Sequence, residues 1–94
     1  MNGPPRIAVA WLLAVDWQEW KRLDPHGLQA SYKDWLKDAQ AGLKQLERAG
    51  MAYVRVEIDV KQAVALAREM GFGKIDGRAR GAIATALAAR QQNQ

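Results

Sequence analysis

The most regular alternation of apolar and polar positions lies in residues 31–49. Apolar side chains recur there every three or four residues, as in a helix with one buried face; they are Tyr32, Trp35, Leu36, Ala39, Leu43 and Leu46. Ser31 followed by Asp34 approximates an N-terminal capping box, and Gly50 stands where a glycine commonly ends a helix. The pattern therefore predicts a long helix over residues 31–49.

Two segments on either side of this helix predict strands. Residues 6–15 place apolar side chains on both faces of an extended chain, which is typical of a strand covered on both sides. A helix continuing through Trp20 is the alternative, and it fits less well because polar residues would surround its second half. In residues 51–58, polar Arg55 and Glu57 alternate with apolar residues, so one face of this strand is expected to be more exposed to solvent than the other. Residues 16–23 between strand and helix could form one or two helical turns.

The remaining chain predicts two more helices. Asp59 with Gln62 marks the start of a helix over residues 60–70, which Gly71 and Phe72 end, and Asp76 starts a last helix over residues 77–90. We expect a flexible N-terminus at 1–5, a single domain at 6–90 and a frayed tail at 91–94.

The predicted fold class is a small α/β domain in the order strand, helix, strand, helix, helix. The two strands could pair in parallel, with the long helix as the crossover between them. A two-stranded sheet packed by helices is marginal alone, so we expect either a missed strand or dimerisation to complete it.

Composition narrows the possible chemistry. The 94 residues contain no cysteine, which excludes disulfides, thiol nucleophiles and cysteine-ligated zinc, and which fits a reducing, cytoplasmic location. The longest apolar run, residues 7–15, is too short for a membrane span of about 20 residues, so no membrane partner is expected. The only serine is the helix cap Ser31, and the only histidine, His26, lies in a turn-rich segment, so a hydrolytic triad is not expected.

One cluster of acidic residues is a candidate magnesium site. Glu57, Asp59 and Lys61 alternate at the end of the second predicted strand, and Asp16 could join them from the first. Carboxylates of this kind hold magnesium in metal-dependent nucleases. These residues also have a simpler explanation: Asp59 caps a helix, and Glu57 lies on the solvent-exposed face of the strand. We therefore predict no catalytic residue, no metal site and no cofactor.

The last predicted helix carries a stripe of small residues, within about 60° of arc on a helical projection; they are Gly77, Gly81, Ala84 and Ala88. A glycine inside a helix costs about 1 kcal/mol relative to alanine, so Gly81 suggests the close approach of another backbone. The other side of this helix is apolar, formed by Ala79, Ala82, Ile83, Ala86 and Leu87. The helix could then pack on two sides, which suggests a protein partner or a homodimer contact. Trp17 and Trp20 are further interface candidates if they are exposed.

Basic residues suggest nucleic acid as another partner. The net charge is +4 and the isoelectric point about 9.8. Four basic residues form a stripe on the long helix, and two more lie on the second helix of a degenerate helix-turn-helix pattern at residues 60–88; they are Lys33, Lys37, Lys44 and Arg48, then Arg78 and Arg80.

These observations support three hypotheses. The leading one is a non-enzymatic protein-interaction module that self-associates. The alternative is a nucleic-acid-binding accessory protein that uses the basic stripe and the helix-turn-helix residues. The third is a small metal-dependent phosphodiesterase-type enzyme that uses the acidic cluster.

Overall fold

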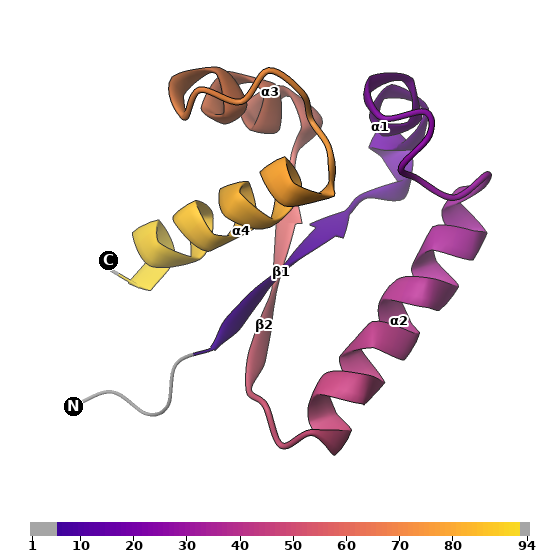
Figure 1. The fold of residues 1–94 in the computed structure, drawn as a ribbon, viewed down its shortest axis with the longest axis vertical. Coiled ribbons are helices and arrows are strands. Elements are labelled where there is room, and N and C mark those ends of the chain that lie inside the picture. Colours follow the sequence, from indigo (N-terminus) through magenta and orange to yellow (C-terminus); the bar gives the residue numbers. More distant parts are fainter. Residues whose placement is uncertain (1–5, 93–94) are drawn as a thin grey trace.

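The computed structural model describes residues 6–92, which form a two-stranded parallel sheet with four α-helices (Figure 1). In chain order the elements are β1 (Ile7–Leu12), the 3-10 turn η1 (Ala14–Asp16), α1 (Trp17–Leu23), α2 (Tyr32–Arg48), β2 (Tyr53–Ile58), α3 (Val60–Glu69) and α4 (Gly77–Gln92). The small α/β class is therefore confirmed. The predicted flexible segment 1–5 and residues 93–94 of the predicted tail lie outside the described residues.

Local hydrogen bonds start the three longer helices where the sequence predicts. Ser31 Oγ accepts from the Asp34 backbone N–H at 3.2 Å at the start of α2. Asp59 caps α3 in the same way at 3.2 Å, and Asp76 caps α4 at 3.0 Å. Each side-chain oxygen satisfies a backbone donor that has no partner within the helix, which is why short-range sequence signals located these ends correctly.

Two glycines end α2 and α3 in the left-handed backbone region. Gly50 has φ 75° and Gly71 has φ 84°, a conformation that residues with a Cβ rarely adopt. After Gly71 the Phe72 N–H donates to the Ala67 carbonyl at 2.8 Å, and the Phe72 ring packs against the core. The segment 71–74 is thus a connector between two helices.

The two strands pair in parallel, from Ile7 opposite Tyr53 to Leu12 opposite Ile58. The first strand is shorter than the predicted segment 6–15, because β2 gives way to helix α3 after Ile58 and leaves nothing for later residues to pair with. The chain instead turns into η1, where Val15 is 87% exposed. Residues 17–23, for which the sequence allowed one or two helical turns, form α1.

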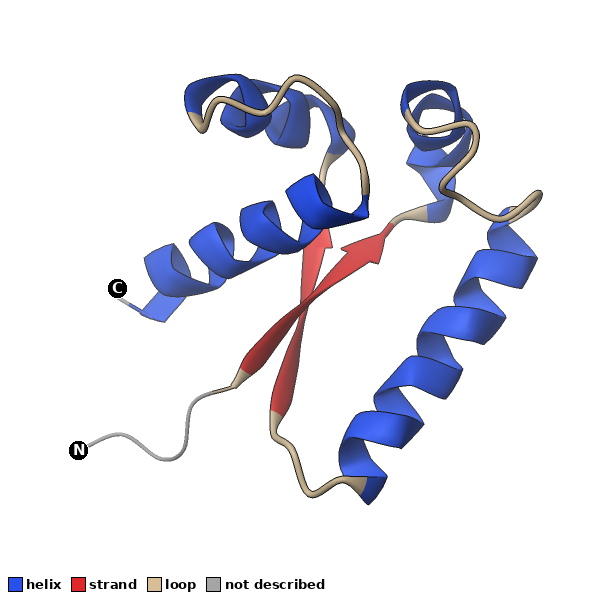
Figure 2. Ribbon diagram, viewed as in Figure 1, coloured by secondary structure: helices blue, strands red, loops and turns tan. Residues whose placement is uncertain are grey.

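Helices cover the sheet on its two faces, as Figures 1 and 2 show for α4 and α2. On the α2 face the Trp11 and Trp35 rings meet edge to face, with centroids 5.2 Å apart. On the opposite face Leu12, Val56 and Ile58 are at most 2% exposed. Both faces of β1 are therefore used for packing, as its apolar pattern predicts.

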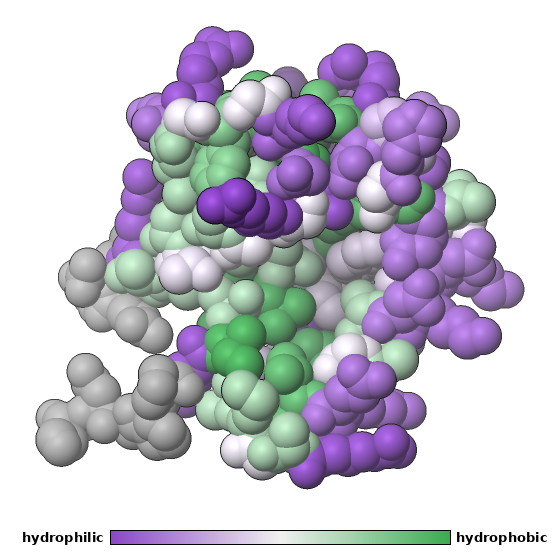
Figure 3. All heavy atoms as spheres, in the orientation of Figure 1, coloured by the Kyte–Doolittle hydropathy of each residue, from purple (hydrophilic) through white to green (hydrophobic). Residues whose placement is uncertain are grey.

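The surface seen in Figure 3 divides into a polar and an apolar part. Polar residues cover α2, while apolar surface gathers below α4, around the beginnings of the two strands. Ile7, at the start of β1, and Met51, just before β2, are 36% and 48% exposed. Among residues 6–92, the helices are too short or too polar to cross a membrane.

Candidate interaction surface

A buried ion pair joins α4 to the segment between α1 and α2. Arg80 Nη1 lies 2.8 Å from Asp24 Oδ2, and the two side chains are 10% and 14% exposed. Arg80 also donates to the Ile75 carbonyl at 3.0 Å, and Asp24 accepts the Gly27 N–H at 3.1 Å. Every one of these contacts is internal, so the pair serves to hold two distant segments of the chain together.

This pair corrects one of the predicted nucleic-acid residues. Arg80 is 8% exposed as a whole residue and its guanidinium is engaged with Asp24, so it is not available to contact a phosphate or a base edge. Arg78, on the opposite side of the helix, is exposed. The sequence could not show this difference, because the partner Asp24 lies 56 residues away along the chain.

The stripe of small residues on α4 does not form one surface. Ala84 is completely buried, which corrects its assignment to an interface, and Ala88 is partly buried against the core. Ala88 also lines a shallow groove of about 300 Å³ beside the start of β1. Gly77 is exposed and Gly81 is partly exposed, and apart from the backbone of α4 itself no heavy atom of the described residues would lie within 4 Å of a Cβ on Gly81. Within the described chain, no neighbouring backbone therefore requires glycine at this position.

The two tryptophans of α1 are buried to different extents. Trp20 is 0% exposed and belongs to the core, so the condition for placing it at an interface is not met. Trp17 is half-buried in an aromatic cluster, with its ring 5.7 Å from that of Tyr32 and 6.4 Å from that of Trp35. These rings join α1 to α2, and of the two tryptophans of α1 only Trp17 keeps exposed surface for another molecule.

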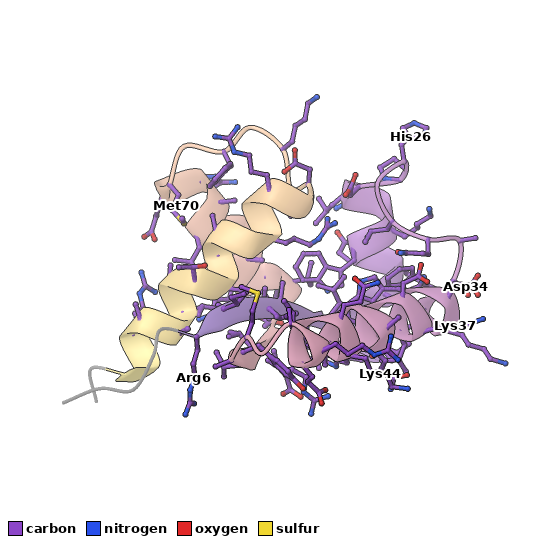
Figure 4. All side chains as sticks on the ribbon, turned by 60° about the horizontal axis from the view of Figure 1, so that its bottom comes forward. Arg6, His26, Asp34, Lys37, Lys44 and Met70 are labelled. Carbon is purple, nitrogen blue, oxygen red and sulfur yellow. The ribbon has the colours of Figure 1, made fainter. Side chains whose placement is uncertain are left out.

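The basic stripe of α2 lies on the surface of the domain. Lys33, Lys37, Lys44 and Arg48 are all exposed. Figure 4 shows Lys37 and Lys44 extending from α2 away from the sheet. Asp34 is exposed on the same helix and reduces the positive charge near the N-terminal end of the stripe.

The acidic residues do not gather as a magnesium site would require. Asp16 approaches the end of β2, but its carboxylate accepts the Val60 N–H at 3.3 Å, and Asp59 caps the same helix. Glu57 and Lys61 are exposed. Within residues 6–92, no three acidic or histidine side chains lie close enough together to hold a metal ion. The carboxylates of Asp16 and Asp59 are used to start α3.

A pocket of about 450 Å³ lies between the loops at residues 23–26 and 73–76. Its two carboxylates are already engaged, since Asp24 pairs with Arg80 and Asp76 caps α4. His26 lines the same pocket and extends from the tip of its loop (Figure 4). The carboxylates in this pocket thus serve the fold.

The outer edge of β2 is a feature that the sequence did not identify. The Ile7 N–H donates to the Ala52 carbonyl at 2.9 Å, which fixes the direction of the backbone groups along the pair. Because successive residues of a strand turn their N–H and C=O groups to opposite sides, those of Tyr53, Arg55 and Glu57 point away from β1. In the described part of the chain no third strand pairs with them.

Two opposite charges lie along this edge. Arg55 and Glu57 are both exposed, and their side chains share the sheet face on which Trp11 lies. The Arg55 guanidinium carbon lies 4.8 Å from the centroid of the Trp11 ring, a cation–π contact. Among residues 6–92, the ion pairs formed are Arg22–Glu19 and Arg80–Asp24, so neither charge on the β2 edge is paired.

Tyr53 marks the beginning of the β2 edge. Its hydroxyl donates to Glu47 Oε1 at 3.2 Å, which joins the strand to the last turn of α2. Partial burial, together with the adjacent negative charge of Glu47, raises the pKa of Tyr53. The phenol therefore stays neutral at physiological pH, and the charges on the edge are those of Arg55 and Glu57.

The only sequence signal for this edge was the alternation of polar and apolar residues in 51–58, which indicates one solvent-exposed face. It revealed which positions of the strand are polar. It could not reveal that β2 is an edge strand or which backbone groups point outward. Comparisons of the chain with models of known protein families, with curated proteins and with solved structures gave no match.

Proposed function

We propose that this chain is a non-enzymatic protein-interaction module that self-associates through its open sheet. The observation that supports the proposal is the outer edge of β2, whose backbone donors and acceptors face outward with no strand beside them in residues 6–92. Such an edge is a template for pairing with another chain. A sheet of only two strands also gains stability when further strands extend it.

Sedimentation equilibrium from low micromolar to millimolar concentration tests self-association. The proposal predicts an average mass that rises from that of the monomer as concentration increases, without protein loss to aggregates. A chain that keeps the monomer mass over the whole range contradicts the proposal.

Nucleic-acid binding is a second candidate, supported by the four exposed basic residues along one side of α2. If all four contacted phosphates of duplex DNA, the logarithm of the binding constant would fall with the logarithm of salt concentration at a slope of about −3 to −4. Fluorescence anisotropy with labelled DNA of mixed sequence measures this slope.

Variants identify the residues responsible for any binding. Lys37→Gln or Lys44→Gln each reduces the slope by about 1. Lys61→Gln, an exposed lysine on α3, is the matched control and leaves the slope unchanged. Binding that does not depend on salt, or that weakens equally in the control, contradicts the role of the stripe.

A further inference from the structure

We infer that a second copy of this chain docks on the outer edge of β2 in antiparallel orientation, about a two-fold axis that passes at Val56. The resulting sheet has four strands in the order β1, β2, the partner's β2 and the partner's β1. This inference rests on the proposed self-association and adds to it the edge, the register and the residues that recognise the partner.

Exposure and backbone geometry favour β2 over β1. Ala8, Ala10 and Leu12, whose backbone groups point outward from β1, are partly or fully buried, and the Leu12 carbonyl already accepts the Tyr32 hydroxyl at 3.0 Å. The edge of β1 is therefore partly satisfied within the chain. On β2, by contrast, Arg55 and Glu57 are exposed and their backbone groups point outward.

Charge selects the register. With the two-fold axis at Val56, Arg55 stands opposite the partner's Glu57 and Glu57 stands opposite the partner's Arg55. Opposite charges facing each other across an antiparallel pair are favourable, and like charges are unfavourable. An axis at Arg55 would oppose two arginines, and an axis at Glu57 would oppose two glutamates.

The backbone supports the same register. In an antiparallel pair, residues that directly face each other and point their backbone groups at the partner exchange two hydrogen bonds. Arg55 and Glu57 both have outward-pointing N–H and C=O groups, so the two facing pairs would form four interchain hydrogen bonds. The cation–π contact of Arg55 lies on one sheet face and leaves these backbone groups accessible.

Charge reversal with complementation tests this interface by sedimentation equilibrium. Arg55→Glu places carboxylates opposite carboxylates in both pairs, and Glu57→Arg places cations opposite cations. We expect each variant alone to associate about thirtyfold more weakly than the natural chain, since two attractive pairs become repulsive. An equimolar mixture of the two variants restores both ion pairs, so the mixture returns to dimers.

Controls separate this result from effects on folding and general charge. Arg68→Glu and Glu69→Arg, at exposed positions on α3, change charge by the same amounts and leave association unchanged. Glu57→Arg leaves the contact between Arg55 and Trp11 intact, so its loss of association does not arise from that stack. Thermal melts confirm that each variant is folded.

The possible outcomes distinguish a failure of the proposed β2 interface from a failure of the proposed self-association. If the natural chain is monomeric at all concentrations, both the proposed function and this interface are overturned. If the natural chain associates and both variants associate equally well, or if the mixture does not recover, the β2 interface is overturned while self-association stands.

Discussion

Breaking the ion pair between Asp24 and Arg80 should strongly lower the stability of the fold. It joins two segments 56 residues apart, and its side chains are only 10% and 14% exposed. Removing one partner of a buried pair costs about 3–5 kcal/mol, because the remaining charge is left without compensation. Since this pair retains slight exposure, we expect about 3 kcal/mol for Asp24→Asn and a similar loss for Arg80→Met. The free energy of unfolding of a domain is about 5–15 kcal/mol, so either loss is easily measured.

The double variant tests the physical reason. With both charges removed, no unpaired charge remains, and the remaining cost comes from the Ile75 carbonyl that loses its donor. We expect the double variant to be about 1–2 kcal/mol less stable than the natural chain, rather than the roughly 6 kcal/mol that independent effects would give. Guanidinium denaturation, followed by tryptophan fluorescence, measures all four free energies. Single-variant losses that add within about 0.5 kcal/mol would refute the coupling between these residues.

Three glycine and capping variants give further tests by thermal or chemical denaturation. Gly27→Ala would place a Cβ 2.6 Å from Asp24 Oδ1, so it should displace that carboxylate and lower stability by about 2 kcal/mol; unchanged stability would contradict this geometry. Gly42→Ala lies inside α2, and apart from the helix backbone no heavy atom of the described residues lies within 4 Å of the new Cβ, so the substitution should raise stability by about 1 kcal/mol; a loss of stability would mean that another group fills this space. Ser31→Ala removes the cap of α2 and should lower stability by about 1 kcal/mol, whereas an unchanged midpoint would show that the cap contributes nothing.

Local signals in the sequence predicted the elements well. The caps at Ser31, Asp59 and Asp76 act within three residues, and the glycines that end α2 and α3 act through their own φ angles. Such signals can be identified from the sequence alone, because they do not depend on tertiary structure. The end of β1 was predicted too late because it depends on where the paired strand β2 ends.

Burial was harder to predict at positions where two sides of an element are similar. The apolar and small-residue sides of α4 differ little, so the sequence did not show that Ala84 lies in the core. Arg80 was predicted to bind nucleic acid because its partner, Asp24, is remote in the chain and the sequence does not show the pair. The β2 edge likewise depends on strand order and on the direction of backbone groups, which a pattern of alternating residues does not specify.

Amide hydrogen exchange at two protein concentrations tests the self-association claim most directly, because it reports on the backbone groups of the edge. In dilute solution the Arg55 and Glu57 amides point outward from β2 and should exchange quickly, whereas at high concentration we predict that both become protected. The Ala8 and Ala10 amides, which point outward from β1, serve as the internal comparison. Protection that does not change with concentration at Arg55 and Glu57, or that appears at Ala8 and Ala10 instead, would contradict the account.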